Sequence, residues 1–350
     1  MEISMIPAKA LTSDLEEKWS LLQQTDDDFA SPFFCPEFTS SLALYRNDIY
    51  VALMKEGSEV VGFFPFRLGR YAIAKPMQMC DYQGIIVKKG VEWNVEDVLK
   101  GCGLVAWDFD QLIASQTILT KANNFTSSVS RTINLREGYD VYITGLQKSS
   151  PKWINNIFRN IRKFEREVGT INFRQDISDT SILHKLLEWK AQKYTRSGKF
   201  EAWVTQTLET IFAIRKRNFR GVLSALYVKE ELVAAHFGMC SGKILHWWFP
   251  AYNQAYEKYS PGIILLLKVA DAFSSLGVEV IDFGPGEEGY KTHFSNDVIH
   301  IGQGSFEISS LPTLTRKSFR KMKIFIRKSP YLYIIAKKVY GLLRRAAVGI

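Results

Sequence analysis

Between Ala234 and Lys291 the chain carries a strand, a helix and a second strand in succession, and this order constrains the fold more than any other feature. An apolar run ends at Phe249, a leucine-rich helix is predicted over 261–276, and Val278–Phe283 is predicted to return as a strand. A crossover of this length normally places its two strands parallel in one sheet. The second half of the chain is therefore predicted to be an α/β unit.

Three short strands joined by tight turns lead into this crossover. They are predicted over residues 222–229, 232–239 and 243–249. Such spacing is typical of an antiparallel meander. The sheet is thus expected to be mixed, antiparallel at one side and parallel at the other. Upstream of the meander, helices are predicted over 180–196 and 201–218.

The first 145 residues are predicted to mix helices and strands. A helix is expected over 11–24, a hairpin over 49–54 and 60–67, and strands over 83–87 and 104–109, whereas the polar segment 123–135 is expected to be largely loop. Within the last of these strands, Asp108-Phe109-Asp110 has two interpretations, a metal-binding DxD motif or a plain strand end. We favour the strand end because no other carboxylates of a metal site are identifiable.

An amphipathic helix is predicted from Pro151 to Val168, since a serine precedes the proline and Gly169 follows as a stop. Its apolar residues recur at spacings of three and four. The opposite face is basic and carries Lys152, Arg159, Arg162, Lys163 and Arg166. This face is either solvated or a cationic rim for an anionic ligand.

Charge and cysteine usage limit the possible classes of protein. The chain has 350 residues, four cysteines and a formal charge of +9. Eleven Lys and Arg without any Asp or Glu lie from Arg316 onward, so the rest of the chain is near neutral. The cysteines are far apart, which argues against a zinc site or a disulfide framework and predicts a reducing, cytoplasmic setting. No apolar run approaches the roughly twenty residues of a spanning helix.

The helix start at Ser260-Pro261-Gly262 is a candidate phosphate site. Ser260 can cap the helix, Pro261 fits its first turn, and Gly262 leaves the free amides open to a ligand. An ordinary helix start is the alternative.

Two further features have both a structural and a catalytic interpretation. His236 is either a buried structural histidine or a base beside a strand with His246, Trp247 and Trp248. Asp282 stands at the end of a parallel strand, where sites in α/β sheets are common. The glycine-rich loop after Asp282 leaves four side chains free to project into a site: Glu287, Glu288, Tyr290 and Lys291. A solvated turn is the alternative interpretation of this loop.

Together these segments resemble the acyltransferases of the GNAT superfamily grouped as CelD or BcsL type, which are related to the FemAB peptidoglycan aminoacyl transferases. The resemblance is carried by His236, the tryptophan-rich strand, Tyr259–Gly262 with its helix, and Asp282-Phe283-Gly284 followed by Tyr290-Lys291. It is specific over about 150–300. It is looser over 1–145, where Ser31-Pro32-Phe33 and Asp81-Tyr82-Gln83-Gly84 are similar to the family's amino-terminal half.

The resemblance implies two GNAT-like domains of the acyl-CoA N-acyltransferase fold, over 1–145 and 146–315, with a basic amphipathic tail over 316–350. Relatives transfer an acyl group, here expected to be acetyl, from coenzyme A to an amine or hydroxyl acceptor. They often act in exopolysaccharide, cellulose or cell-envelope production, so a saccharide acceptor and the envelope polysaccharide machinery are the implied partners. The second domain is the implied donor carrier, and no metal is required.

Roles for individual residues also follow from the resemblance. It implies His236 or Glu287 as base, Asp282 as orienter or acceptor ligand, and Tyr290 as donor to the departing thiolate. The acyl-CoA donor is implied to lie at the helix start, on Tyr259, Ser260, Gly262 and Ile263. The acceptor is implied to contact Trp247, Trp248, Lys291 and Arg162.

One departure keeps other donors open. The common GNAT phosphate signature, Arg or Gln followed by Gly-x-Gly or Ala, is absent from this sequence. Aminoacyl-tRNA, the donor of the FemAB relatives, is therefore an alternative, with the basic helix and tail contacting RNA. A non-catalytic assembly factor with this fold is the third possibility.

The tail alternates apolar residues with its eleven cations, and Pro330 is expected to divide it into two helices. Such a segment suits an anionic membrane surface. The sequence therefore predicts peripheral attachment to the inner face of the membrane, with a solvated basic tail as the alternative.

Overall fold

The computed structural model describes residues 1–116, 122–195, 198–286, 289–308 and Thr313. Its strands are β1 (Glu2–Pro7), β2 (Ile49–Glu56), β3 (Glu59–Gly69), β4 (Ile73–Lys75), β5 (Ile86–Val87), β6 (Ala106–Ile113), β7 (Asn123–Asn134), β8 (Ile171–Arg174), β9 (Arg220–Val228), β10 (Glu231–Ser241), β11 (Ile244–Tyr252), β12 (Val280–Pro285) and β13 (Asp297–Glu307). Its α-helices are α1 (Ser13–Gln24), α2 (Pro36–Tyr45), α3 (Val95–Gly101), α4 (Tyr139–Ser149), α5 (Pro151–Glu167), α6 (Thr180–Tyr194), α7 (Ala202–Ala213), α8 (Pro261–Ser275) and α9 (Gly289–Phe294).

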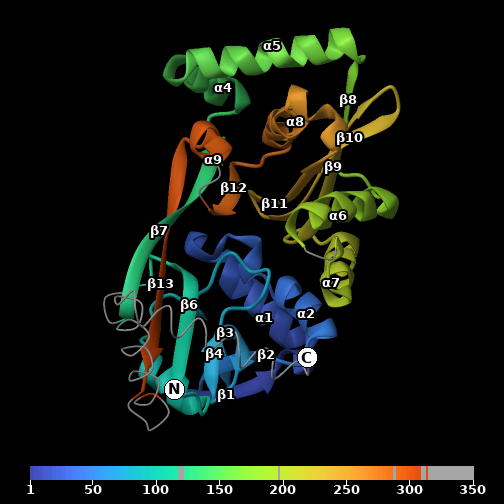
Figure 1. The fold of residues 1–350 in the computed structure, drawn as a ribbon. Coiled ribbons are helices and arrows are strands. Elements are labelled where there is room, and N and C mark those ends of the chain that lie inside the picture. Colours follow the sequence, from blue (N-terminus) through green and yellow to red (C-terminus); the bar gives the residue numbers. More distant parts are fainter. Residues whose placement is uncertain (117–121, 196–197, 287–288, 309–312, 314–350) are drawn as a thin grey trace, which may run out of the picture.

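All thirteen strands join one mixed sheet that runs through both halves of the chain (Figure 1). The order is β1-β2-β3-β4-β6-β13-β7-β12-β11-β10-β9-β8, with β5 beside β3. Two strands cross between the halves, because β7 pairs with β12 and the late strand β13 pairs with the early strand β6. The two halves are thus joined by main-chain hydrogen bonds rather than by a linker alone.

Helices cover both faces of the sheet. On one face a single hydrophobic core spans the halves and contains Trp19 of α1, Phe38 of α2, Leu186 of α6 and Phe212 of α7. On the other face α4, α5 and α8 cover the second half, and α3 covers the first. No helix of the described residues is both long and apolar enough to cross a membrane.

The meander, the crossover and the helices of the second half agree with the sequence predictions. β9, β10 and β11 are antiparallel neighbours, and β11 pairs in parallel with β12. The helix expected over 201–218 is shorter, ending at Ala213, because Arg215 already forms a bridge with Arg220. The predicted tail over 316–350 lies outside the described residues.

One prediction for the first half was wrong. Residues 123–135 were expected to be mainly loop, but the structure shows the long strand β7 over Asn123–Asn134. The strand is polar because the side chains of Asn123–Ser128 are exposed, and its main-chain hydrogen bonds are made with β13. Of the strand predicted over 83–87, only Ile86–Val87 forms a strand, and Gln83 makes an isolated bridge to Leu112.

Candidate functional site

The site begins where β11 and β12 separate. These parallel strands pair over three residues each, and the last pair is His246 with Asp282. Both strands continue beyond that pair, β11 to Tyr252 and β12 to Pro285, without further pairing between them. The edge of β11 that faces β12 is therefore without a strand partner after His246, within the described residues.

His246 lies between two carboxylates at this point. Its Nε2 donates a hydrogen bond to Asp81 Oδ2 at 2.9 Å, and its Nδ1 lies 3.4 Å from Asp282 Oδ2, an ion-pair distance without hydrogen-bond alignment. Burial lowers the pKa of His246, but the contacts and charges of the two carboxylates outweigh it and raise the pKa to about 9. The ring is thus an imidazolium at neutral pH.

Asp282 is fully buried and is held as a carboxylate by its surroundings. Its Oδ1 accepts hydrogen bonds from the hydroxyl of Ser130 on β7, at 2.7 Å, and from the amide of Gly284, at 2.9 Å. Burial raises the pKa of Asp282, but His246 and these two donors together bring it below its ordinary value. Because β12 lies between β11 and β7, Asp282 has His246 on one neighbouring strand and Ser130 on the other.

Asp81 comes from the other half of the chain, in the segment between β4 and β5. Its side chain is 28% exposed, whereas His246 and Asp282 are wholly buried, so Asp81 is the member of the three that meets solvent. It lies against the α-carbon of Gly284, where an added Cβ would stand 2.6 Å from Asp81 Oδ2. We name these three residues, Asp81, His246 and Asp282, the carboxylate–imidazole cluster.

Aromatic side chains of the first half close over the cluster. Phe33 packs edge-on against the His246 ring, with centroids 4.8 Å apart. The buried Tyr82 hydroxyl has no aligned hydrogen-bond partner among the described residues, and burial together with the charge of Asp282 raises its pKa well above the ordinary value. Tyr82 therefore stays protonated and remains a donor beside Asp282.

The corresponding gap in the first half is filled by the chain itself. There β4 and β6 pair in parallel only at Ile73–Ala74 with Ala106–Trp107. The next segment occupies the place that opens, because Gln83 exchanges two main-chain hydrogen bonds with β6 and β5 pairs with β3. In the second half, no described segment fills the gap between β11 and β12 in this way.

His236, predicted as a base, lies away from the cluster. It is wholly buried on the sheet face that α8 covers, and its ring stacks on Trp247 with centroids 3.9 Å apart. Neither ring nitrogen has a hydrogen-bond partner among the described residues, and burial lowers its pKa well below the ordinary value. Strand alternation directs His246 to the opposite face, toward Phe33.

The residues predicted to bind the donor surround the start of α8. Ser260 stands at the N-cap in a left-handed conformation, φ 57°, and its hydroxyl does not cap the helix as the sequence had suggested. Gly262 faces the Tyr252 ring, and the Ile263 amide is used in a turn to the Ser260 carbonyl. Tyr259 is occupied elsewhere, because its ring stacks on Phe164 and its hydroxyl donates to Glu167.

The remaining predicted residues are dispersed. Trp247 is buried under α8, whereas Trp248 packs beneath the first half against Phe33 and Phe38. Tyr290 and Lys291 belong to α9. Tyr290 packs edge-on to Phe283, and the buried Lys291 donates a hydrogen bond to the Pro285 carbonyl. Arg162 is exposed on α5, and Glu287 lies outside the described residues.

The sequence placed Asp282 at a strand end, whereas it lies inside β12 at the last residue paired with β11, and it gave Asp81, Ser130 and Tyr82 no role in the site. Asp81 and Tyr82 stood only in a motif of the resemblance, and His246 only as part of a possible cleft wall. Their convergence is tertiary, so the available signal was a histidine inside an apolar strand, directly before two tryptophans. Among the described residues, no group of three or more His, Cys, Asp or Glu side chains is arranged to hold a metal ion.

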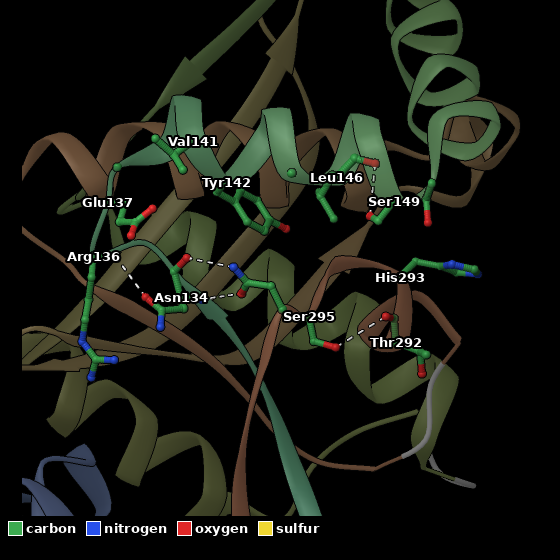
Figure 2. A pocket seen from close by; sticks show the side chains of 14 residues that line it. Asn134, Arg136, Glu137, Val141, Tyr142, Leu146, Ser149, Thr292, His293 and Ser295 are labelled. Carbon is green, nitrogen blue, oxygen red and sulfur yellow. Dashed lines mark hydrogen bonds between the residues drawn. The ribbon is translucent and has the colours of Figure 1, made fainter.

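A separate surface hollow of about 850 Å³ lies between α4 and α9 (Figure 2). Glycines at Gly138 and Gly145 open one wall, and Asn134 and Asn296 hydrogen-bond across its floor. No member of the carboxylate–imidazole cluster lines it. We therefore place the candidate site at the cluster and not at this hollow.

Comparisons with known proteins bear on this geometry. Residues 152–292 match the family model of the acetyltransferase (GNAT) domain. This stretch is similar to GNAT acetyltransferase domains. The matched range begins in α5 and ends in α9, so it includes β11, β12 and two of the three cluster residues. A comparison with curated protein sequences gave no match.

Solved structures share the fold over nearly the whole chain. FemX is similar with a TM-score of 0.60 and 9% identity, covering 90% of this chain and 99% of FemX. The C-terminal domain of an Agrobacterium fabrum protein described as a lysylphosphatidylglycerol synthetase has a TM-score of 0.54 and 13% identity, covering 89% of this chain and 95% of that domain. A Bacteroides thetaiotaomicron protein of unknown function has a TM-score of 0.51 and 12% identity, with 85% and 98% covered. The GNAT model matches the second half, and these structures share the fold of both halves.

Proposed function

We propose that the protein is an acyltransferase whose donor is an acyl-CoA thioester bound where β11 and β12 separate. One observation carries the proposal: the pairing of these strands stops at His246 and Asp282 while both strands continue. Main-chain groups on the free edge of β11 can pair with the amides of an extended ligand, as an added strand would. The start of α8 follows β11, and its Gly262 amide at the positive end of the helix dipole is proposed to face the donor's phosphates.

Asp81 is the proposed base in this site. It is the cluster member that meets solvent, and His246 fixes its orientation through the 2.9 Å hydrogen bond. His246 does not act as the base, because its raised pKa keeps it protonated. The bound thioester supplies the activated acyl carbon, and Asp81 would accept the proton of the attacking amine or hydroxyl.

The protonated Tyr82 hydroxyl beside Asp282 provides a donor for charge that develops on the departing sulfur. This assignment replaces Tyr290 with Tyr82 in the proposed chemistry. The acyl group is proposed to be acetyl, and the acceptor a saccharide amine or hydroxyl of cell-envelope or exopolysaccharide production, as the CelD or BcsL resemblance implies. The tail over 316–350 is proposed to bring the enzyme to an anionic inner membrane surface.

Calorimetric titration of the full chain with acetyl-CoA and, separately, with aminoacyl-tRNA tests the donor. We expect saturable binding of acetyl-CoA and a large loss of transfer to amine and hydroxyl acceptors in Asp81→Asn, with acetyl-CoA binding kept. Asp48→Asn is the matched control, because Asp48 is a similarly half-buried carboxylate of the first half that pairs with Arg46. Binding of aminoacyl-tRNA without acetyl-CoA binding would overturn the donor assignment, and no binding of either would favour an assembly factor.

A further inference from the structure

α5 carries a straight cationic stripe on the outside of the molecule. With 3.6 residues per turn, Lys152, Arg159, Lys163 and Arg166 fall within about 60° of one another around the helix axis. All four are exposed, and Arg162 is exposed beside them. The stripe extends over about 21 Å along the helix. Figure 1 shows α5 lying across one end of the molecule, outside α4 and α8.

Neighbouring elements lengthen the stripe at both ends. Lys148 in the last turn of α4 is exposed directly before the helix begins. Lys229 reaches the other end, where its side chain lies against Gly169, and Lys258 lies over the Tyr259 ring. We name these eight residues the α5 cationic surface: Lys148, Lys152, Arg159, Arg162, Lys163, Arg166, Lys229 and Lys258.

The two carboxylates of α5 neutralise only part of this surface. Glu165 lies about 140° from Lys152 around the axis, away from the stripe. Glu167 accepts a hydrogen bond from Tyr259 and lies near one end of the stripe, where Lys163, Lys258 and Arg166 help to lower its pKa. Arg159 binds the uncharged Asn156. In the part of the chain that the structure describes, Lys152, Arg159 and Arg162 therefore face solvent without a carboxylate partner, and Glu167 compensates one charge at the other end of the stripe.

The shape of the surface indicates the partner. The apolar side of α5 is used up in the protein, since Ile154, Ile157 and Phe164 are buried against the second-half core. The residues between the cations are Asn155 and Asn156, so the stripe has neither an exposed ring for stacking bases nor an apolar wedge for a protein groove. A straight row of cations fits a plane of phosphates, to which each cation adds attraction without insertion.

We propose that the α5 cationic surface docks the protein on a membrane rich in anionic phospholipid, with α5 lying parallel to the lipid headgroups. This surface is part of the folded second half and acts independently of the tail. It is also independent of the proposed transfer reaction, since none of its residues belongs to the carboxylate–imidazole cluster.

Co-sedimentation of the full chain with vesicles tests the proposal. The probe is a vesicle of 70% phosphatidylcholine and 30% phosphatidylglycerol, compared with pure phosphatidylcholine. We expect binding to the anionic vesicles only. We expect Arg159→Gln/Lys163→Gln to bind about 30-fold more weakly, as the loss of two headgroup-facing cations implies. Binding should fall steeply between 0.1 and 1 M salt, where the screening length drops from about 10 to about 3 Å.

Arg70→Gln/Lys89→Gln is the matched control, because it removes the same charge from exposed positions of the first half. We expect its vesicle affinity to stay within about twofold of the parent. Equal losses in both double variants would show that net charge alone matters and would overturn the proposal, as would an unchanged affinity in the α5 variant or no binding by the parent. If Arg159→Gln/Lys163→Gln kept its vesicle binding but lost binding to RNA measured in parallel, the surface would be assigned to RNA instead.

Discussion

His246 and Asp81 are hydrogen-bonded at 2.9 Å although 165 positions separate them in the sequence and each belongs to a different half of the chain. His246 in turn lies against Asp282, which Ser130 and Gly284 hold from the sheet. A residue of the first half is therefore built into the place where the second half's strands separate. The two halves form one site at this point.

Replacing Asp282 by Asn leaves a protonated His246 in a wholly buried place with one carboxylate instead of two. We expect the free energy of unfolding to fall by about 3 kcal/mol, since breaking a buried ion pair at one partner is strongly destabilising. Urea denaturation of both proteins measures this. Asp14→Asn, at an exposed ion pair with Lys18, should change the value by less than about 1 kcal/mol. A loss at Asp282 no larger than at Asp14 would contradict the buried ion pair.

The stability should be greatest near pH 6.5 and should decline from there toward pH 9. The pKa of His246 is raised from the ordinary 6.5 to about 9, so its contribution is complete below pH 6.5 and is lost as the pH rises through 9. The pKa of His236 is lowered by burial, so the folded state is disfavoured as the pH falls below 6.5 and the unfolded state binds protons there. Urea midpoints at intervals from pH 5 to 10 test both limbs.

Single variants separate the two limbs. His246→Gln should remove most of the decline between pH 6.5 and 9, above which the buried cysteine thiols also contribute, and His236→Phe should flatten the acid decline. The stability should fall more steeply again where Asp282 becomes protonated, below the ordinary aspartate pKa of 3.8. If the alkaline decline persisted unchanged in His246→Gln, other groups would be responsible for it.

The second half could be predicted well because its signals are local. The proline that starts α5 and the glycine that follows it lie next to the helix they delimit, and the turns of the meander fix the pairing of β9, β10 and β11. β7 could not be predicted in this way. Its residues Asn123–Ser128 are polar because they are exposed, and the strand is stabilised by β13, which comes about 170 residues later.

The candidate site was predictable only in part for the same reason. Asp282 was singled out because the parallel pairing of the crossover ends there, although β12 itself continues to Pro285. Asp81 reaches His246 through packing of the two halves, and no spacing in the sequence encodes that contact. His236 drew attention as a histidine in an apolar strand, but the alternation of side chains directs it under α8.

Gly284→Ala should displace Asp81 and reduce transfer activity more than stability. The added Cβ would stand 2.6 Å from Asp81 Oδ2, and the backbone has a φ of 69°, which strains any residue with a side chain. We expect about a tenfold loss of kcat/KM, since misplacing a proposed base by a fraction of an ångström is costly in catalysis.

Gly277→Ala is the matched control for this variant. Gly277 also has a positive φ, of 85°, but a Cβ there would meet nothing within 4 Å. Both variants should lose about 1 kcal/mol of stability from the backbone strain, while only Gly284→Ala should lose activity. Equal activities in the two variants would exclude a role for the Asp81–Gly284 contact.

His236→Phe distinguishes the cluster from the histidine that the sequence had suggested as a base. The substitution keeps an aromatic ring on Trp247 and removes two buried nitrogens that have no hydrogen-bond partner among the described residues. Removing unsatisfied polar atoms compensates for the slightly larger ring, so the free energy of unfolding should change by no more than about 1 kcal/mol. Transfer activity should stay within about threefold of the parent, whereas His246→Phe, which leaves Asp81 and Asp282 without their shared cation, should lower it at least about a hundredfold. Activity lost in His236→Phe but kept in His246→Phe would move the chemistry to the α8 side of the sheet and overturn the assignment of the carboxylate–imidazole cluster.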